Sequence, residues 1–317
     1  MRTLTHALLA AAICLLADPA LAERRESLLV VSPSRARAPK IKVELLLPDD
    51  ATEKVPVMII MHGSSGVRDV REFAYAREFL KLGVGGAIVD SFGSRGIVST
   101  VRDQSQLASV EMMADAVDTL RVLAKHPAID PSRIGIIGYS KGGTVVIKSA
   151  LRRYLEPVAK GEVRFALLIA VYPWCNEFPL DMRGTGTTLH MLNGADDTYV
   201  SIPGCVEYAK RMQDAGANVV VKTYKGKHGW DTPGNADWTD KQGENQSQCF
   251  YDETGKGTWV ERGSKITVMD NNKRTADAGN ATAKCMTRSV SGGYSREAHS
   301  QSLDDIRGFM RDAFRLR

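Results

Sequence analysis

Short apolar runs alternate with stretches of helical spacing between about residue 41 and residue 225 of this chain. Continuous apolar runs are typical of strands buried on both faces, and apolar residues three or four apart are typical of helices that cover a sheet. We predict strands at residues 42–47, 57–61, 86–90, 134–138, 165–171, 189–193 and 219–224, and helices at 70–82, 105–125, 142–154 and 203–215. This alternation predicts the α/β class, with a mainly parallel sheet flanked by helices.

The pattern changes between residues 230 and 300, where Gly, Asn, Thr, Lys and Asp dominate and apolar residues recur with no clear period. We interpret this region as an irregular insertion or cap, in which residues 258–260 and 265–269 pair as a small hairpin. Helical spacing then returns and predicts a closing helix, so we expect residues 23–317 to form one domain that contains the insertion. The recurring apolar positions of that helix are Leu303, Ile306, Phe309, Met310 and Ala313.

The first 22 residues have a pattern of their own. Arg2 precedes an apolar run at residues 7–17, and Ala-Leu-Ala follows at residues 20–22. These features are typical of a secretory signal, and the run is shorter than the roughly 20 residues that a membrane-spanning helix needs. We expect cleavage near Glu23, a secreted or periplasmic mature chain, and no membrane span in it.

Composition limits the partners and metals that we expect. The 317 residues carry a formal net charge of +5, with 43% hydrophobic and 25% charged residues, as in a globular protein. The basic residues are scattered rather than gathered into a stripe, so nucleic acid is not an expected partner. Neither a Cys-x-x-Cys spacing nor an Asp-x-Asp-x-Asp-Gly loop occurs, so we expect no metal.

Four cysteines remain after signal cleavage, and an even number in an exported chain favours two disulfides. They are Cys175, Cys205, Cys249 and Cys285. Among the three possible connectivities we favour Cys175 with Cys205 and Cys249 with Cys285, because each pair then closes a local loop.

The sequence Gly-Tyr-Ser-Lys-Gly at residues 138–142 stands between a predicted strand and a predicted helix. A Gly-x-Ser-x-Gly motif in this position is typical of a nucleophile elbow, in which small neighbours let a tight turn present the serine hydroxyl to substrate. Ser140 is therefore the candidate nucleophile.

A serine nucleophile needs a histidine base and an acid that orients it, and in α/β-hydrolases both follow the serine in the chain. His190 lies within a predicted strand, whereas His228 follows a strand end and is favoured over His299. The acid is also expected at a strand end, where Asp196 and Asp197 both qualify. We favour Asp197 and keep Asp196 as the alternative.

An oxyanion hole needs two backbone N–H groups near the nucleophile. We expect one from Lys141, which follows the nucleophile directly. The other is expected from the glycine-bearing loop at residues 62–66, where either Ser64 or Ser65 supplies the N–H.

Three further residues are candidates for contact with substrate: Arg95 and Trp174 follow strand ends, and Trp230 stands two residues after the candidate base. Arg95 has the fork of donors that holds a carboxylate, although a solvated loop arginine is an equal interpretation. Trp174 and Trp230 are candidates for lining an acyl or aryl pocket, with simple packing as the alternative.

Five motifs occur in order along the chain, namely His62-Gly63-Ser64-Ser65-Gly66, Asp90-Ser91-Phe92-Gly93-Ser94-Arg95-Gly96, Gly138-Tyr139-Ser140-Lys141-Gly142-Gly143, Gly194-Ala195-Asp196-Asp197 and Lys227-His228-Gly229. This order resembles the dienelactone hydrolase-like branch of the α/β-hydrolases. The resemblance implies the α/β-hydrolase fold and a triad of Ser140, Asp197 and His228. The founding enzymes of that branch use a cysteine as nucleophile and lack both a signal and this insertion, so dienelactone is not the expected substrate.

We therefore predict an exported serine hydrolase that cleaves small-molecule carboxylic esters through an acyl-enzyme on Ser140 and needs no cofactor. A serine peptidase of the prolyl-oligopeptidase type would use the same triad, but the chain has no room for the large N-terminal gating domain of those enzymes. A non-catalytic binding protein on the same scaffold is the other alternative. The sequence predicts no particular oligomeric state.

Overall fold

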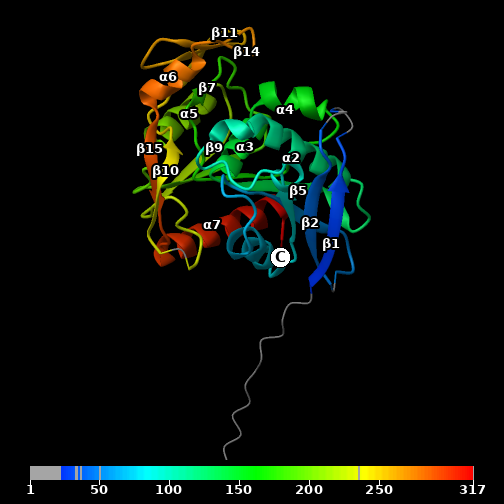
Figure 1. Ribbon diagram of the computed structural model, residues 1–317. Helices are drawn as coiled ribbons and strands as arrows, with labels where there is room; N and C mark the ends of the chain where they lie inside the picture. Colours follow the sequence, from blue (N-terminus) through cyan, green and yellow to red (C-terminus); the bar gives the residue numbers. More distant parts are fainter. Residues whose placement is uncertain (1–22, 33–34, 36–37, 50, 235, 317) are drawn as a thin grey trace, which may run out of the picture.

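The computed structural model describes residues 23–316 except for 33–34, 36–37, 50 and 235. The expected signal at residues 1–22 lies outside the described residues. The central element is an eight-stranded sheet with the strand order β1-β2-β4-β3-β5-β6-β8-β9 (Figure 1). Its strands are β1 (Glu23–Val30), β2 (Ile41–Pro48), β3 (Val55–Met61), β4 (Gly85–Asp90), β5 (Ile129–Tyr139), β6 (Leu168–Val171), β8 (Leu189–Gly194) and β9 (Val219–Tyr224).

The sheet is mainly parallel, as the alternating pattern predicts. β1, β2 and β4 pair antiparallel in turn, and all other neighbouring strands are parallel. Each strand predicted from the sequence is present. β1 is an addition to the prediction, because its first four residues are charged and it lies at the sheet edge, where only one neighbour covers it.

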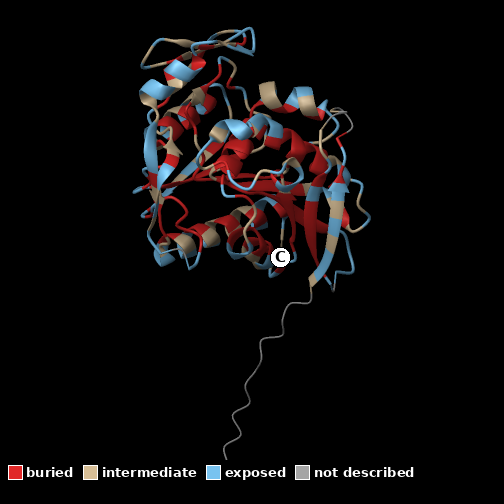
Figure 2. Cartoon of the chain, in the orientation of Figure 1, coloured by how far each residue is buried: buried red, intermediate tan, exposed pale blue. Residues whose placement is uncertain are grey.

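Helices cover both faces of the sheet, and each face has its own core. The helices are α1 (Ala74–Leu80), α2 (Ser109–Leu123), α3 (Lys141–Ser149), α4 (Arg152–Ala159), α5 (Ile202–Asp214) and α7 (Arg296–Phe314). Successive side chains of a strand point to opposite faces. Ile59 and Met61 of β3 therefore join the core of α2, α3, α4 and α5, whereas Met58 and Ile60 join the core of α1 and α7. Figure 2 shows the buried residues concentrated along this sheet.

The helix predicted at residues 142–154 is two helices, which corrects the prediction. α3 ends at Ser149, and Leu151 has an extended backbone that bridges to Gly184 before α4 begins. The apolar spacing continues across this break because both helices bury residues in the same core. Periodicity alone therefore does not reveal the break.

The region after β9 is more regular than the irregular insertion that we expected. Its elements are β10 (Trp238–Asn245), β11 (Tyr251–Gly255), β12 (Thr258–Glu261), β13 (Thr267–Asp270), β14 (Lys273–Arg274), α6 (Ala278–Cys285) and β15 (Thr287–Gly292). β10 pairs with β15, and β12 pairs with β13 in the expected hairpin. β11 also pairs in parallel with the short strand β7 (Glu177–Phe178), which lies between β6 and β8. Most residues of these strands are half-buried or exposed, and many are polar, so the strands show little hydrophobic period.

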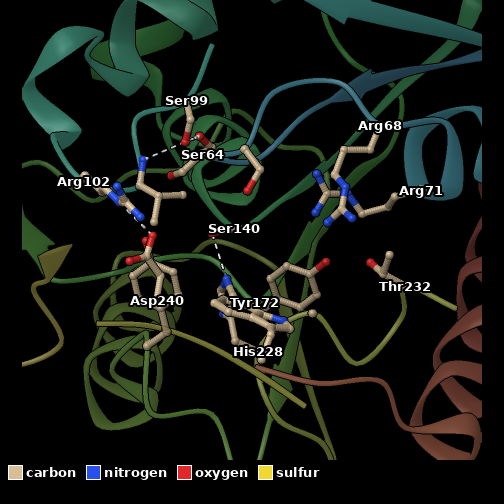
Figure 3. A pocket seen from close by; sticks show the side chains of 16 residues that line it. Ser64, Arg68, Arg71, Ser99, Arg102, Ser140, Tyr172, His228, Thr232 and Asp240 are labelled. Carbon is tan, nitrogen blue, oxygen red and sulfur yellow. Dashed lines mark hydrogen bonds and ion pairs between the residues drawn. The ribbon is translucent and has the colours of Figure 1, made fainter. Parts of the chain in front are cut away.

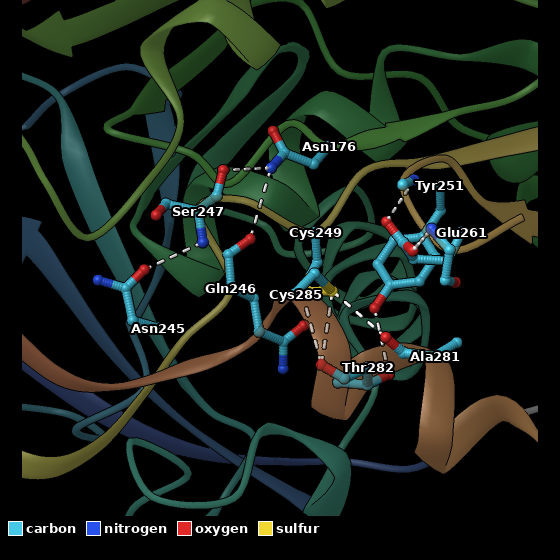
Figure 4. The surroundings of a disulfide bond; sticks show 12 residues. Asn176, Asn245, Gln246, Ser247, Cys249, Tyr251, Glu261, Ala281, Thr282 and Cys285 are labelled. Carbon is cyan, nitrogen blue, oxygen red and sulfur yellow. Dashed lines mark hydrogen bonds between the residues drawn. A yellow bond between two sulfur atoms is a disulfide. The ribbon is translucent and has the colours of Figure 1, made fainter.

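Two disulfides reinforce the fold, one in the main fold before β9 and one in the region after β9. Cys175 pairs with Cys205, and Cys249 pairs with Cys285, with Cα–Cα distances of 4.9 and 5.0 Å. These are the two pairings favoured from the sequence. The first joins the segment after β6 to α5, and the second joins the segment before β11 to the end of α6 (Figure 4).

Candidate active site

Ser140 lies on the sharp turn between β5 and α3. Its backbone has φ 55° and ψ −115°, a strained conformation for a residue with a side chain. Glycine is required on both sides of this turn. A Cβ on Gly138 would lie 2.1 Å from the Gly142 carbonyl oxygen, and a Cβ on Gly142 would lie 2.2 Å from that of Met61. The two glycines of the motif are therefore needed because the turn leaves no room for a side chain at either position.

The structure brings three of the sequence candidates into one hydrogen-bonded chain. The Ser140 hydroxyl lies 2.9 Å from His228 Nε2 (Figure 3). On the other side of the ring, His228 Nδ1 lies 2.7 Å from Asp197 Oδ2. A carboxylate only accepts hydrogen bonds, so Nδ1 carries the proton and Nε2 is left to accept from the hydroxyl. This is the tautomer that a general base needs.

The surroundings of the two aspartates differ. Asp197 is buried, and its Oδ1 accepts hydrogen bonds from the backbone N–H of Tyr199 at 2.8 Å and of Val200 at 3.1 Å. Asp196 is exposed and directs its backbone N–H to the Gly226 carbonyl. The structure therefore places Asp197, and not Asp196, against the histidine.

The other two histidines lie elsewhere. The His190 ring stacks on Phe309 with centroids 3.8 Å apart. His299 contacts the hydroxyl of Tyr294. Neither is in hydrogen-bond contact with Ser140, which agrees with the preference for His228.

Two tyrosine rings pack against the imidazole of His228, and no motif in the sequence points to either one. The rings of Tyr172 and Tyr199 each lie 4.7 Å from the imidazole, centroid to centroid. Tyr172 donates its hydroxyl to Asp231 at 2.6 Å, and burial raises its pKa well above the ordinary value. Burial raises the pKa of Tyr199 as well, so both hydroxyls stay neutral near pH 7. The two rings pack against the imidazole at tilted angles of 59° and 57° and restrict its orientation. Their places after β6 and β8 were the only sequence signal.

The loop after β3 and the start of α3 provide backbone N–H groups beside the nucleophile. Among the described residues, no hydrogen-bond acceptor is found for the N–H of Ser64, Ser65 or Lys141. The loop is shaped by His62, whose Nδ1 lies 2.8 Å from the Gly63 carbonyl and whose Nε2 accepts from the Ser91 N–H at 3.2 Å. Burial lowers the pKa of His62, so the ring stays neutral and keeps this arrangement.

A cavity of about 570 Å³ opens onto Ser140 (Figure 3). Its lining residues are Gly63, Ser64, Ser65, Arg68, Arg71, Ser99, Val101, Arg102, Ser140, Tyr172, Tyr199, His228, Gly229, Thr232, Trp238 and Asp240. Trp238 and Asp240 belong to β10, so the insertion forms one wall. Asp240 pairs with Arg102 at 3.0 Å and links that wall to the loop before α2. The lining combines polar side chains with apolar surface in similar amounts.

The three residues considered for substrate contact do not line this cavity. Arg95 uses both ends of its guanidinium on Asp115, at 2.8 and 3.0 Å, so its fork is occupied within the protein. Trp174 donates to the Gln246 carbonyl at 3.1 Å. Trp230 is fully buried and packs behind Tyr172 with ring centroids 4.8 Å apart. All three side chains make their contacts within the protein, which corrects the expected role in substrate binding.

The described part of the chain contains no group of three or more His, Cys, Asp and Glu side chains placed to hold a metal ion. Within the same residues, every helix is too short or too polar to cross a membrane.

Comparison with known proteins places these residues in context. A sequence model described as "Dienelactone hydrolase family" matches residues 41–252. No curated protein matches the chain. A protein provisionally named as a dienelactone hydrolase of Klebsiella pneumoniae superposes with a TM-score of 0.56 and 16% identity, over 67% of this chain and 89% of that one.

An esterase of the planctomycete Thermogutta terrifontis, solved with propionate, gives a TM-score of 0.52 and 16% identity, over 66% of this chain and 86% of its own. An α/β hydrolase from a Medee basin deep-sea metagenome gives a TM-score of 0.50 and 17% identity, over 66% of this chain and 85% of that one. At these identities the likeness concerns the fold. The sequence match runs from the start of β2 to the second residue of β11 and contains Ser140, Asp197 and His228.

Proposed function

This chain belongs to the dienelactone hydrolase family, and we propose that it is a serine hydrolase that cleaves carboxylic esters through an acyl-enzyme on Ser140. The observation that carries the proposal is the hydrogen-bonded chain from Ser140 through His228 to Asp197 at the end of the sheet. The Thermogutta esterase, which has a similar fold, has been solved phosphorylated by paraoxon. Such a reaction is expected of an activated nucleophile.

In the acylation step, Ser140 Oγ forms a bond to the ester carbonyl carbon while His228 Nε2 takes the hydroxyl proton. The Asp197 carboxylate stabilises the imidazolium that results. The carbonyl oxygen becomes an oxyanion, which the N–H groups of Lys141 and of Ser64 or Ser65 stabilise. When this intermediate collapses, the bond to the alcohol oxygen breaks and that oxygen takes the proton from Nε2.

In the deacylation step, water replaces the alcohol. His228 Nε2 accepts a proton from the water as the water oxygen attacks the acyl carbon. The bond to Ser140 Oγ then breaks, and Oγ takes the proton back. The products are a carboxylic acid and the free enzyme, so the cycle needs no cofactor.

The cavity supports small or polar esters as substrates. Serine, threonine and arginine supply half of its lining residues, and the rest include Val101, Trp238 and two tyrosine rings. The volume of about 570 Å³ limits the length of an acyl chain, and a long chain that entered would lie beside hydroxyl and guanidinium groups, which reduces its hydrophobic gain. We therefore propose short or polar ester substrates, in agreement with the expected small-molecule partner.

We also propose that the protein is exported. The chain forms two disulfides, and such bonds persist in oxidising compartments outside the cytosol. The signal pattern at residues 1–22 supports the same conclusion.

The test of the proposed function is Ser140→Ala, measured with p-nitrophenyl esters of increasing acyl length and with a fluorophosphonate probe. We expect the variant to fold, to lose labelling, and to lose ester turnover by at least about 10³-fold. Ser132→Ala, an exposed serine on the same strand, is the matched control and should behave as wild type. Labelling that persists in Ser140→Ala, or a wild type that neither labels nor turns over any ester, would refute the proposal.

A further inference from the structure

Gln104 occupies a position that joins several segments of the active site. It is the first residue of the short 3-10 helix η3 (Gln104–Gln106). An earlier 3-10 helix, η2 (Gly93–Arg95), lies in the same connection. The turn lies in the loop between β4 and α2, far in sequence from the elbow and from the insertion. Gln104 does not belong to the triad, and no motif singles it out.

The side chain of Gln104 bonds to the two parts of the expected oxyanion hole. Its Oε1 accepts from the Ser64 hydroxyl at 3.1 Å and from Lys141 Nζ at 3.2 Å. Lys141 Nζ also donates to the Gln104 carbonyl oxygen at 3.0 Å. One residue thus holds the loop after β3 and the first residue of α3.

Two more contacts extend this link to the rest of the site. Gln104 Nε2 donates to the Tyr199 hydroxyl at 3.3 Å, and the ring of Tyr199 packs on His228. The backbone N–H of Gln104 donates to Glu244 on β10 at 2.9 Å. Gln104 therefore contacts the insertion and both oxyanion segments directly, and it is linked to His228 through Tyr199.

The orientation of the Gln104 amide follows from chemistry. An ammonium has donors only, so the amide atom that faces Lys141 Nζ must be the oxygen. The nitrogen then faces the Tyr199 hydroxyl oxygen, which can accept. Burial lowers the pKa of Lys141 to about 8, against the opposing effect of the Asp103 and Glu244 carboxylates, so the lysine still carries its proton near pH 7.

We propose that Gln104 is a positioning residue that fixes the distance between the two oxyanion donors by tying the Ser64 loop to Lys141. The inference rests on the proposed function, since it assigns the donors to an oxyanion. Preorganised donors stabilise the transition state only when they are held at the right separation, and small displacements are costly. The Ser64 carbonyl also accepts from the Thr100 N–H at 2.8 Å and from the Ser99 hydroxyl at 3.1 Å, which hold the loop to the segment before η3. The bonds of Gln104 Oε1 connect the same loop to Lys141.

The test is Gln104→Leu, which keeps the approximate size of the side chain and removes its hydrogen bonds. We expect kcat for a p-nitrophenyl ester to fall about 10- to 100-fold with KM within about three-fold, because only the transition state is affected. Inhibition by a boronic acid, which forms a tetrahedral adduct on serine, should weaken in proportion to the loss of kcat/KM.

The matched control is Gln106→Leu in the same turn. Gln106 is exposed, and its side chain donates to the Ser99 and Asp103 carbonyls instead of contacting Ser64 or Lys141. We expect its kcat to stay within about three-fold of wild type, so that a loss specific to Gln104 is separated from damage to the turn.

Gln104→Glu keeps an acceptor oxygen for Ser64 and Lys141, and we expect its kcat to lie closer to wild type than that of Gln104→Leu. Equal kcat losses in the Glu and Leu variants, or a folded Gln104→Leu with wild-type kcat and boronic acid inhibition, would overturn the inference. If the proposed function itself is wrong, the result is different, because the wild-type protein would then fail to react with the fluorophosphonate probe.

Discussion

Two adjacent aspartates after β8 illustrate how the site depends on single residues. Asp197 is buried, accepts two backbone N–H bonds through one oxygen, and contacts His228 through the other. Asp196 is exposed to solvent. The backbone bonds hold the Asp197 carboxylate in place, so the imidazole Nδ1–H meets a fixed acceptor. Only one of the pair can orient the base.

We predict that Asp197→Asn lowers kcat for ester hydrolysis by about 10⁴-fold, since an amide can hold the imidazole in the wrong tautomer. Asp196→Asn makes the same chemical change one residue away and should keep kcat within about three-fold of wild type. Steady-state kinetics of the two purified variants, with circular dichroism to check folding, makes the comparison. Equal activities of the two variants would contradict the assigned role of Asp197.

At the scale of the element, the elbow between β5 and α3 shows why glycine flanks the nucleophile. Ser140 adopts a positive φ, and the turn brings the backbone of α3 against β3. The close approach to the Met61 carbonyl leaves no volume for a side chain at Gly142. Elbow geometry and sheet packing therefore impose the same sequence constraint.

We predict that Gly142→Ala lowers the free energy of unfolding by about 3 kcal/mol or more, because its Cβ would overlap the Met61 carbonyl group. Gly308→Ala is the matched control, since Gly308 lies inside α7 and a Cβ there meets no atom within 4 Å. The control should be more stable than wild type by about 0.5–1 kcal/mol. Urea unfolding of both variants tests this, and a Gly142→Ala protein as stable as the control would refute it.

Across the whole molecule, the insertion is joined to the main fold by polar contacts, while each disulfide lies within one of the two regions. Glu253 of β11 is buried and pairs with Arg153 of α4. It also accepts from the N–H of Leu180 at 2.9 Å and of Gly257 at 3.0 Å. Burial alone would raise the pKa of Glu253, but these bonds prevail and lower it from 4.5 to about 2. The folded protein therefore favours the ionised carboxylate.

This shift predicts how stability depends on pH. Between pH 4.5 and about 2 the unfolded chain binds the proton more readily than the folded protein, so the stabilisation from Glu253 is complete above that window and is lost as pH falls through it. We expect Glu253→Gln to lower the free energy of unfolding by about 2–3 kcal/mol at pH 7. The difference from wild type should shrink toward zero near pH 2.

Thermal or urea unfolding at several pH values measures this effect. Glu156→Gln, an exposed glutamate on α4, is the control and should change the unfolding free energy by less than about 0.5 kcal/mol at every pH. A constant difference between Glu253→Gln and wild type from pH 7 to pH 2 would contradict the linkage.

The sequence by itself determined the features that local patterns encode. Strand and helix periodicity gave the α/β sheet, and Gly-x-Ser-x-Gly at a strand end located Ser140, because backbone sterics act between near neighbours. Tertiary structure decided what depends on distant residues. The contact between Ser140 and His228 spans 88 positions, and the choice of Asp197, the occupied fork of Arg95 and the bonds of Gln104 all arise from segments that meet only after folding. Hydrogen bonds and burial are properties of that assembled neighbourhood, and no pattern along one segment contains them.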